Sequence, residues 1–103
     1  MMLETIASQL EALGAPTRLA LYRSLVRAGE EGRAVGSLQQ ELQLPRSTLS
    51  HHLHRLIAAG LVTQERQATT LICRANYQAM DRMVAFLKEE CCVDDSAPRA
   101  QSA

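Results

Sequence analysis

The sequence predicts a small, mainly α-helical domain that contains one β-hairpin. Apolar residues recur at the three- and four-residue spacing of amphipathic helices over most of residues 1–60, and again after residue 76. Between residues 61 and 74 the pattern changes to short, β-branched, alternating runs. A chain of 103 residues has room for one domain. We expect that domain to span residues 1–92, followed by a mobile tail at residues 93–103.

Two helices are expected at the start of the chain. The first has an apolar stripe from Leu3 to Leu13 and ends at Gly14. Pro16 suits the first position of the second helix, because the N–H that proline lacks would have no helical partner there. The glycine-rich stretch at residues 29–32 ends this second helix.

The third and fourth predicted helices are separated by Pro45. Ser37 and Gln40 have the spacing of a capping box, which predicts that the third helix opens at Ser37. Pro45 cannot continue that helix, so a tight turn follows. A fourth helix is expected over residues 46–59. Its apolar residues, which should face the core, are Leu49, Leu53, Leu56 and Ile57.

Two strands and a last helix complete the predicted fold. The strands cover residues 61–66 and 70–74, around a turn at residues 67–69. Asn76 can cap a helix from residue 77 to about residue 91. The apolar stripe of that helix is Met80, Met83, Val84, Leu87 and Cys91. Because a chain this small buries only about 65% of its unfolded surface, dimerisation would help to stabilise it.

The distribution of charge marks the middle of the chain as the part suited to a polyanion. The whole chain is neutral, with 11 lysines and arginines against 11 acidic residues. Residues 42–80 hold four arginines and one glutamate, a formal charge of +3, whereas residues 81–103 hold three basic and five acidic residues, a charge of −2. The middle of the chain could therefore meet phosphate, and the end could not.

Several other classes of protein are disfavoured. No apolar run reaches the roughly 18–20 residues of a membrane span, and the N-terminus lacks the basic region of a signal peptide. Three cysteines do not make a disulfide framework, so we expect a cytoplasmic protein. Aromatic residues are too scarce for base stacking on single strands. No catalytic motif indicates an enzyme, and no cofactor is expected.

The order of the predicted elements is typical of a winged helix-turn-helix. In that unit a short helix, a tight turn and a second helix precede a hairpin, and the second helix lies in the major groove of double-stranded DNA. The outer face of the fourth helix carries hydroxyl, imidazole and guanidinium groups, which suit base edges and phosphates. The candidate DNA-binding residues on it are Arg46, Ser47, Thr48, Ser50, His51, His54 and Arg55. The alternative is an ordinary solvated polar face.

At these residues the chain resembles the ArsR/SmtB family of repressors. Residues 46–62 resemble the family's recognition helix, and the matching positions are Ser50, His52, Leu53, Leu56, Ala59, Gly60, Leu61 and Val62. Residues 13–19 are similar to the family's entry to its second helix, and the resemblance covers about residues 3–90. It implies a homodimer built on the first and last helices, which leaves its operator DNA when a metal or metalloid binds.

The predicted wing departs from the family pattern. Family members often have Arg-x-Gly-Arg at the tip, and this chain has Arg66-Gln67-Ala68-Thr69. The missing glycine and arginine predict a weaker or different minor-groove contact. Arg66 remains a candidate ligand for a DNA phosphate. The equally favoured alternative is that Arg66 is simply a solvent-exposed charge on its strand.

Two sensing sites of the family are absent. Ala34 and Gly36 occupy positions where some members have metal-binding cysteines. The last helix has Asp81 but no histidine to complete the family's zinc site. We do not expect a zinc site from the three histidines at positions 51, 52 and 54, which all lie in the predicted DNA-reading helix. His52 is expected to be a packed structural residue.

The cysteines offer the remaining candidate site. Cys91 and Cys92 lie at the end of the predicted last helix, where they resemble the cysteine pair of arsenic-responsive members. Neighbouring helical residues point about 100° apart, so the two thiols can chelate one atom only if the last turn unwinds. By strand alternation Cys73 shares a face with Leu71 and Ala75, which predicts a buried thiol. Cys73 is also a candidate third ligand.

The surroundings of the pair favour a neutral, thiophilic inducer. Four nearby acids, Glu89, Glu90, Asp94 and Asp95, disfavour the thiolate that a redox sensor needs. Trivalent arsenic, as arsenite or methylarsenite, and antimonite are soft and bind thiols by exchanging hydroxyls for sulfur. We therefore expect an arsenical to be the inducer. A thiol-redox or persulfide sensor, and a cadmium, lead or zinc sensor, are the alternatives.

Overall fold

The computed structural model of the chain describes residues 1–96 and confirms the predicted winged helix-turn-helix, with five helices and a hairpin. In chain order the elements are α1 (Met2–Leu13), α2 (Pro16–Ala28), the short 3-10 helix η1 (Gly29–Glu31), β1 (Arg33–Ala34), α3 (Val35–Leu42), α4 (Arg46–Ala58), β2 (Val62–Gln67), β3 (Thr70–Ala75) and α5 (Tyr77–Lys88). Among residues 1–96 no helix has the length and apolar character needed to cross a membrane.

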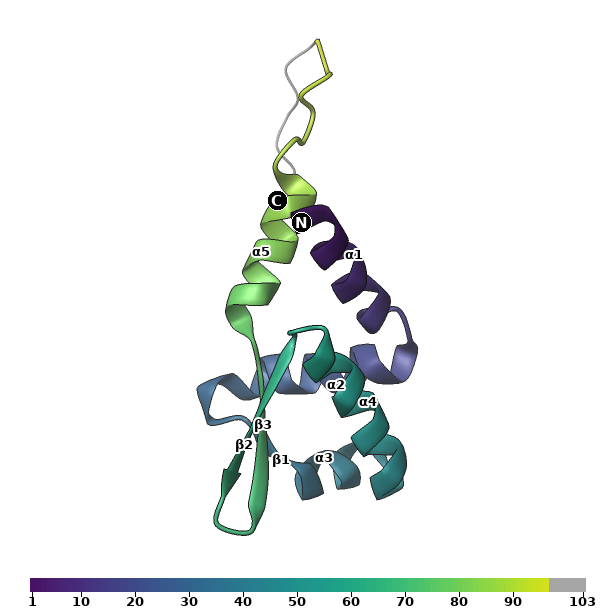
Figure 1. Cartoon of the computed structure of the whole chain (residues 1–103), viewed down its shortest axis with the longest axis vertical. Helices are drawn as coiled ribbons and strands as arrows, with labels where there is room; N and C mark the ends of the chain where they lie inside the picture. Colours follow the sequence, from purple (N-terminus) through teal and green to yellow (C-terminus); the bar gives the residue numbers. More distant parts are fainter. Residues whose placement is uncertain (97–103) are drawn as a thin grey trace.

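The molecule has a broad end and a narrow end (Figure 1). The helices α2, α3 and α4 pack with the three strands to form the broad end, which we call the body. The helices α1 and α5 rise from the body and converge at their far ends, close to the N-terminus of the chain. The result is an elongated shape of 57 × 27 × 23 Å. We call the half formed by α1 and α5 the arm.

The apolar face predicted for α4 is the centre of the core. Leu49, Leu53 and Leu56 are buried there and pack with Leu21 and Leu25 of α2. Burial of such a side chain contributes about 1.5–3 kcal/mol relative to its exposure, so the inner face of α4 is firmly fixed. The outer face of α4 is therefore held in a defined orientation by the body.

The sheet contains a third strand that the sequence analysis missed. The strand order is β1-β3-β2, and all pairs are antiparallel, with Arg33 opposite Cys73 and Ala34 opposite Ile72. A strand of two residues is too short to show an alternating pattern. Gly32 permits the close approach, because a Cβ there would lie 2.5 Å from the carbonyl oxygen of Cys73. Its φ of +71° also favours glycine.

The predicted start of α3 was wrong. The helix begins at Val35, and its N-cap is Ala34, which makes no side-chain capping hydrogen bond. The physical reason is the pairing of β1 with β3, which holds Ala34 in extended conformation and so sets where the helix can begin. Ser37 therefore lies inside the first turn and does not cap the helix. The predictions at Pro16 and Asn76 are confirmed, and Asn76 Oδ1 accepts a hydrogen bond from the Ala79 N–H.

The last helix is shorter than predicted. It ends at Lys88 and not near Cys91, and residues 89–94 form turns. Two acids, Glu89 and Glu90, follow directly, and negative charge is unfavourable at the C-terminal end of a helix. Of the predicted tail, residues 93–96 are described and lie outside helices and strands, and residues 97–103 lie outside the described part of the chain.

Candidate nucleic-acid interface and thiol pair

The predicted DNA-binding residues of α4 form one continuous outer face. Arg46, Ser47, His51, His54 and Arg55 are exposed. The two remaining predicted residues, Thr48 and Ser50, are half-buried. Because the opposite face of the same helix is fixed in the core, this outer face is preorganised and carries donors and acceptors of hydrogen bonds.

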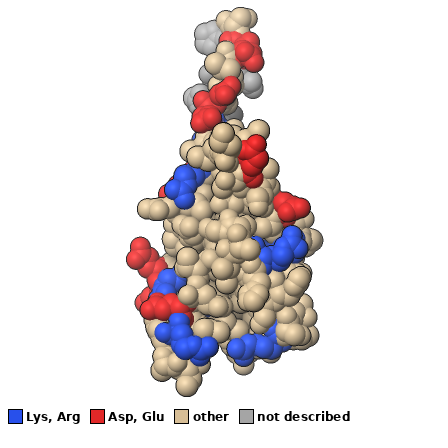
Figure 2. Space-filling view, viewed as in Figure 1, with Lys and Arg blue, Asp and Glu red and all other residues tan. Residues whose placement is uncertain are grey.

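The three candidate DNA-binding arginines, Arg46, Arg55 and Arg66, have no acidic partner among residues 1–96. The two ion pairs of this part join Arg27 to Glu41 at 2.9 Å and Arg74 to Glu65 at 2.6 Å. Arg74 also donates a 2.7 Å hydrogen bond from Nε to the carbonyl oxygen of Glu30. On α4 and the wing, the positive charge that is not paired within residues 1–96 therefore comes from these three arginines. In Figure 2 basic side chains occur at the base of the body, whereas acidic ones occur along the narrow end and also on one side of the body.

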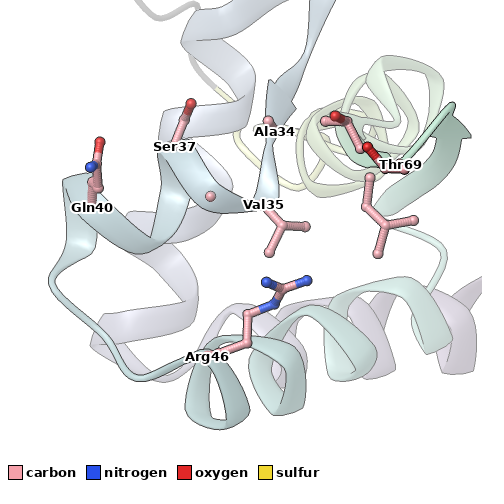
Figure 3. Close-up of a pocket in the computed structure, with 9 residues that line it drawn as sticks. Ala34, Val35, Ser37, Gln40, Arg46 and Thr69 are labelled. Carbon is pink, nitrogen blue, oxygen red and sulfur yellow. The ribbon is translucent and has the colours of Figure 1, made fainter.

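A hollow opens between the start of α3, the tip of the wing and the start of α4 (Figure 3). Its volume is about 450 Å³, and Arg46 points its guanidinium group into it. The polar side chains that line it with Arg46 are Ser37, Gln40, Thr69 and Thr70. No acidic residue lines this hollow. It therefore combines one cation with several uncharged donors, a set that suits a phosphate group.

The α3 and wing residues of this hollow were not among the predicted site residues. Ser37 had been assigned to a capping box, and in the structure its hydroxyl makes no side-chain hydrogen bond within residues 1–96. The residues meet only because β1 pairs with β3, which brings the start of α3 beside the wing. No local pattern in the sequence predicts that the start of α3 and the wing lie side by side.

The wing carries Arg66 on an exposed strand. Arg66 lies on β2 opposite Leu71 of β3 and is exposed. At the tip, Ala68 adopts a left-handed conformation with φ of 56°, at the position where the family often has glycine. An alanine in this conformation is mildly strained. The turn is therefore made without glycine, and its polar groups are the hydroxyls of Thr69 and Thr70.

His52 differs from the other two histidines. Its side chain is half-buried on α4, and its Nδ1 is buried without a hydrogen-bond partner. Burial lowers the pKa of His52, and the charges of Arg18, His51 and Arg55 lower it further. The structure therefore favours the neutral ring, as expected for a packed residue. His51 and His54 are exposed on the outer face.

Cys73 is a core residue. Its side chain is fully buried in β3, and Gln64 Nε2 lies 3.5 Å from its Sγ. Burial raises the pKa of the Cys73 thiol, so the thiol stays protonated. The predicted burial is confirmed. The structure does not bring Cys73 to the other two cysteines, since residues 1–96 contain no group of three or more His, Cys, Asp or Glu side chains that could hold a metal.

Cys91 and Cys92 are exposed and adjacent beyond the end of α5. Their sulfur atoms lie 3.3 Å apart. Cys92 has a φ of 63°, in the left-handed region of backbone conformation. The predicted need for a helical turn to unwind was wrong, because α5 has already ended at Lys88. The two thiols are thus placed to bind one atom together without a change in helix length.

Comparisons with known proteins agree with this geometry. The chain matches the family described as "Helix-turn-helix domain" over residues 13–65. It is 35% identical to "Nodulation protein NolR" of Rhizobium meliloti over 86 residues, which cover 84% of this chain and 68% of that protein.

Two solved structures are also similar. An "ArsR-like Transcriptional Regulator from Rhodococcus sp. RHA1" has a TM-score of 0.76 and 25% identity, with 89% of this chain and 84% of that chain covered. A structure described as "Possible transcriptional regulator for arsenical resistance" has a TM-score of 0.69 and 29% identity, with 88% and 98% covered. The chain belongs to the ArsR/SmtB family of winged helix-turn-helix transcriptional regulators, which are DNA-binding repressors and not enzymes.

Proposed function

We propose that the chain acts as a homodimeric repressor that leaves its operator when a trivalent arsenical binds Cys91 and Cys92. The observation that carries the proposal is the pair of exposed thiols 3.3 Å apart at the end of the molecule opposite the recognition helix. One end of each chain would read DNA, and the other would bind the inducer. A regulator of this kind acts in the cytoplasm, where its DNA is.

The outer face of α4 would lie in the major groove of the operator. Ser47, Thr48 and His51 lie in the first half of the helix, so they are assigned to base edges. Ser50, His54 and Arg55 extend the contact along the groove. Arg66 would meet a phosphate from the wing. The hollow that Arg46 enters would receive another backbone phosphate, and its α3 and wing hydroxyls would donate to that phosphate.

The arm would form the dimer. Its large apolar side chains are exposed in the single chain, including Leu3, Leu10, Val84 and Leu87, with 64%, 40%, 49% and 61% of their surface in water. They lie on the two helices that the family resemblance assigns to dimerisation. A helix of 12 residues such as α5 is marginal in water without packing, so a partner helix would stabilise it.

The chemistry of the pair fits an arsenical better than zinc. Each thiol can give its proton to a hydroxyl of a neutral trivalent arsenical, so that a sulfur–arsenic bond forms and water leaves. This exchange creates no new charge near Glu89 and Glu90. Tetrahedral zinc with bonds of about 2.3 Å would need sulfur atoms about 3.8 Å apart and two further ligands. Residues 1–96 supply no such group of ligands.

A two-thiol site suits methylarsenite, in which a methyl group already holds one arsenic position. Inorganic arsenite or antimonite would need a solvent or small-thiol ligand in the third position, because Cys73 is buried in the body. The likeness to a structure described as "Possible transcriptional regulator for arsenical resistance" supports this class of inducer.

A titration of DNA release tests the proposal. The wild-type protein on its operator is titrated with methylarsenite, arsenite, cadmium, zinc and peroxide. We expect release by methylarsenite, and neither Cys91→Ser nor Cys92→Ser should be released although both still bind the operator. Cys73→Ser is the matched control, and it should respond normally while losing about 1–3 kcal/mol of stability, because its hydroxyl is buried. Release by peroxide alone would favour the redox alternative, and normal release of the Cys91/Cys92 double variant would refute the site.

A further inference from the structure

Both helices of the arm are hydrogen-bonded to the same end of the recognition helix. Gln9 of α1 donates from Nε2 to the carbonyl oxygen of Ala59 at 3.1 Å. Asn76, which precedes α5, donates from Nδ2 to the carbonyl oxygen of Gly60 at 2.9 Å. The backbone N–H of Asn76 also donates to the carbonyl oxygen of Leu61 at 2.8 Å. Three hydrogen bonds therefore join the arm to the residues that directly follow α4.

The buried position of Gln9 does not by itself require a polar side chain. It occupies the buried face of α1 between Ile6 and Ala12, and only 6% of its surface is exposed. A buried amide is unfavourable unless it is hydrogen-bonded, and an apolar side chain would fill the same space without that requirement. The carbonyl groups at the C-terminal end of a helix need partners from outside it. Gln9 supplies such a partner to α4 from another helix.

Asn76 connects two helices with one side chain. Its Oδ1 accepts from the N–H of Ala79 and so caps α5, while its Nδ2 donates to Gly60. The amide group is planar, so these two bonds together restrict the direction of α5 relative to the end of α4. Gly60 has a φ of 80°, which makes the turn between α4 and β2 tight at this point.

We infer that Gln9 and Asn76 are positioning residues for DNA recognition, which set the angle between the recognition helix and the arm. The inference rests on the proposed homodimer. In a dimer joined through the arms, this angle fixes the distance between the two recognition helices. Half-sites on DNA lie about one turn apart, about 34–36 Å, so the angle determines which spacing the dimer prefers. A change in the direction of α5 would reach α4 through the same bonds.

Half-site spacing is the quantity that tests this role. A duplex selected by the wild-type protein from a random pool is remade with its half-sites one or two base pairs closer or further apart. Affinities of the full chain for these duplexes and for a single half-site are measured by fluorescence anisotropy. We expect the wild type to prefer one spacing by about tenfold or more.

Each variant removes one of the two side-chain hydrogen bonds and keeps the other bonds, including the backbone bond from Asn76 to Leu61. Gln9→Met fills a similar volume without a donor. Asn76→Ser still caps α5, and its hydroxyl is too short to reach Gly60. In each variant we expect the spacing preference to fall to about threefold or less, with single half-site affinity within about twofold of the wild type.

A matched control separates positioning from general stability. Ser24→Ala removes the buried 2.8 Å hydrogen bond between α2 and Glu41 of α3, which does not involve the arm. It should lower the melting temperature and leave the spacing preference unchanged. If Gln9→Met and Asn76→Ser do the same, their role is structural only and the inference is wrong. If the wild type itself is a monomer without a preferred spacing, the proposed homodimer is wrong and the inference falls with it.

Discussion

The body and the arm of the molecule differ in how many of their large apolar side chains are buried. Large hydrophobic residues that remain exposed are Met1, Met2, Leu3, Leu10, Leu19, Val84, Leu87 and Val93. Apart from Leu19 of α2, all of them lie in α1, α5 or the segments next to these helices. The body buries its leucines between α2, α3, α4 and the sheet. A single chain therefore buries most apolar side chains of its body and leaves several of those on its arm in water.

The same two regions differ in the state of their cysteines. Cys73 in the body is buried and has a raised pKa, whereas Cys91 and Cys92 beyond the arm are exposed. Accessibility separates a packing thiol from a binding thiol more clearly than residue type does. The end with the exposed apolar side chains therefore also carries the two exposed cysteines. The predictions below test this division, beginning with the largest expected effect.

Charge placed on the arm should break the dimer. In a Val84→Asp, Leu87→Asp variant, two carboxylates would have to be buried at the proposed seam, which is strongly unfavourable. We expect a monomer, and operator affinity lower by on the order of 100-fold because the second reading head is lost. Sedimentation measures the mass, and anisotropy measures the affinity.

The control for this variant is another exposed leucine. Leu19→Asp changes a residue of α2 that is 44% exposed and lies outside the arm. It should remain dimeric and bind the operator as the wild type does. A double variant of α5 that is still a dimer at micromolar concentration would show that the seam lies elsewhere.

Removing the base-reading groups of α4 should have the next largest effect. Alanine at Ser47, Thr48 and His51 together should lower the preference for operator over random DNA by on the order of 10- to 100-fold, because base contacts supply discrimination. Unfolding temperature should change little, since Ser47 and His51 are exposed and Thr48 is only half-buried. Unchanged preference in the triple variant would mean that α4 does not read the bases.

A phosphate contact gives a different signature, which sharpens the assignment. Arg46→Ala should weaken binding to all DNA and reduce the slope of log affinity against log salt by about one. Arg82→Ala, which removes an exposed arginine of α5, is the control and should leave the slope unchanged. If both variants reduced the salt slope equally, a phosphate-binding site at the start of α4 would be contradicted.

Local sequence signals predicted most of the fold. The periodicity of α4 identified its buried face, and Pro16 and Asn76 marked helix starts correctly, because these signals act within one turn of a helix. Alternation along a strand also placed Cys73 in the core. These features depend on residues close together in the chain.

Features that depend on distant residues were missed or misplaced. The start of α3 and the hollow beside it follow from the pairing of β1 with β3, about 40 residues further along the chain. The approach of the Cys91 and Cys92 sulfurs follows from the early end of α5 and from the left-handed backbone at Cys92. Hydrophobic periodicity contains no signal for either.

Acid should weaken the body slightly through His52, and this is the smallest effect that we predict. Burial lowers the pKa of His52 in the folded chain below the ordinary histidine value of 6.5, so the unfolded chain binds more protons just below that pH. Stability should therefore fall as the pH drops through 6.5 and level off below the folded pKa. Denaturant unfolding between pH 7.5 and 5.5 measures the slope. His52→Gln should flatten it, whereas His54→Gln, on the exposed face of α4, should not. An equally steep slope in His52→Gln would assign the acid sensitivity to another group. Because part of the His52 ring stays in water, replacing the ring should change the slope of stability against pH only modestly.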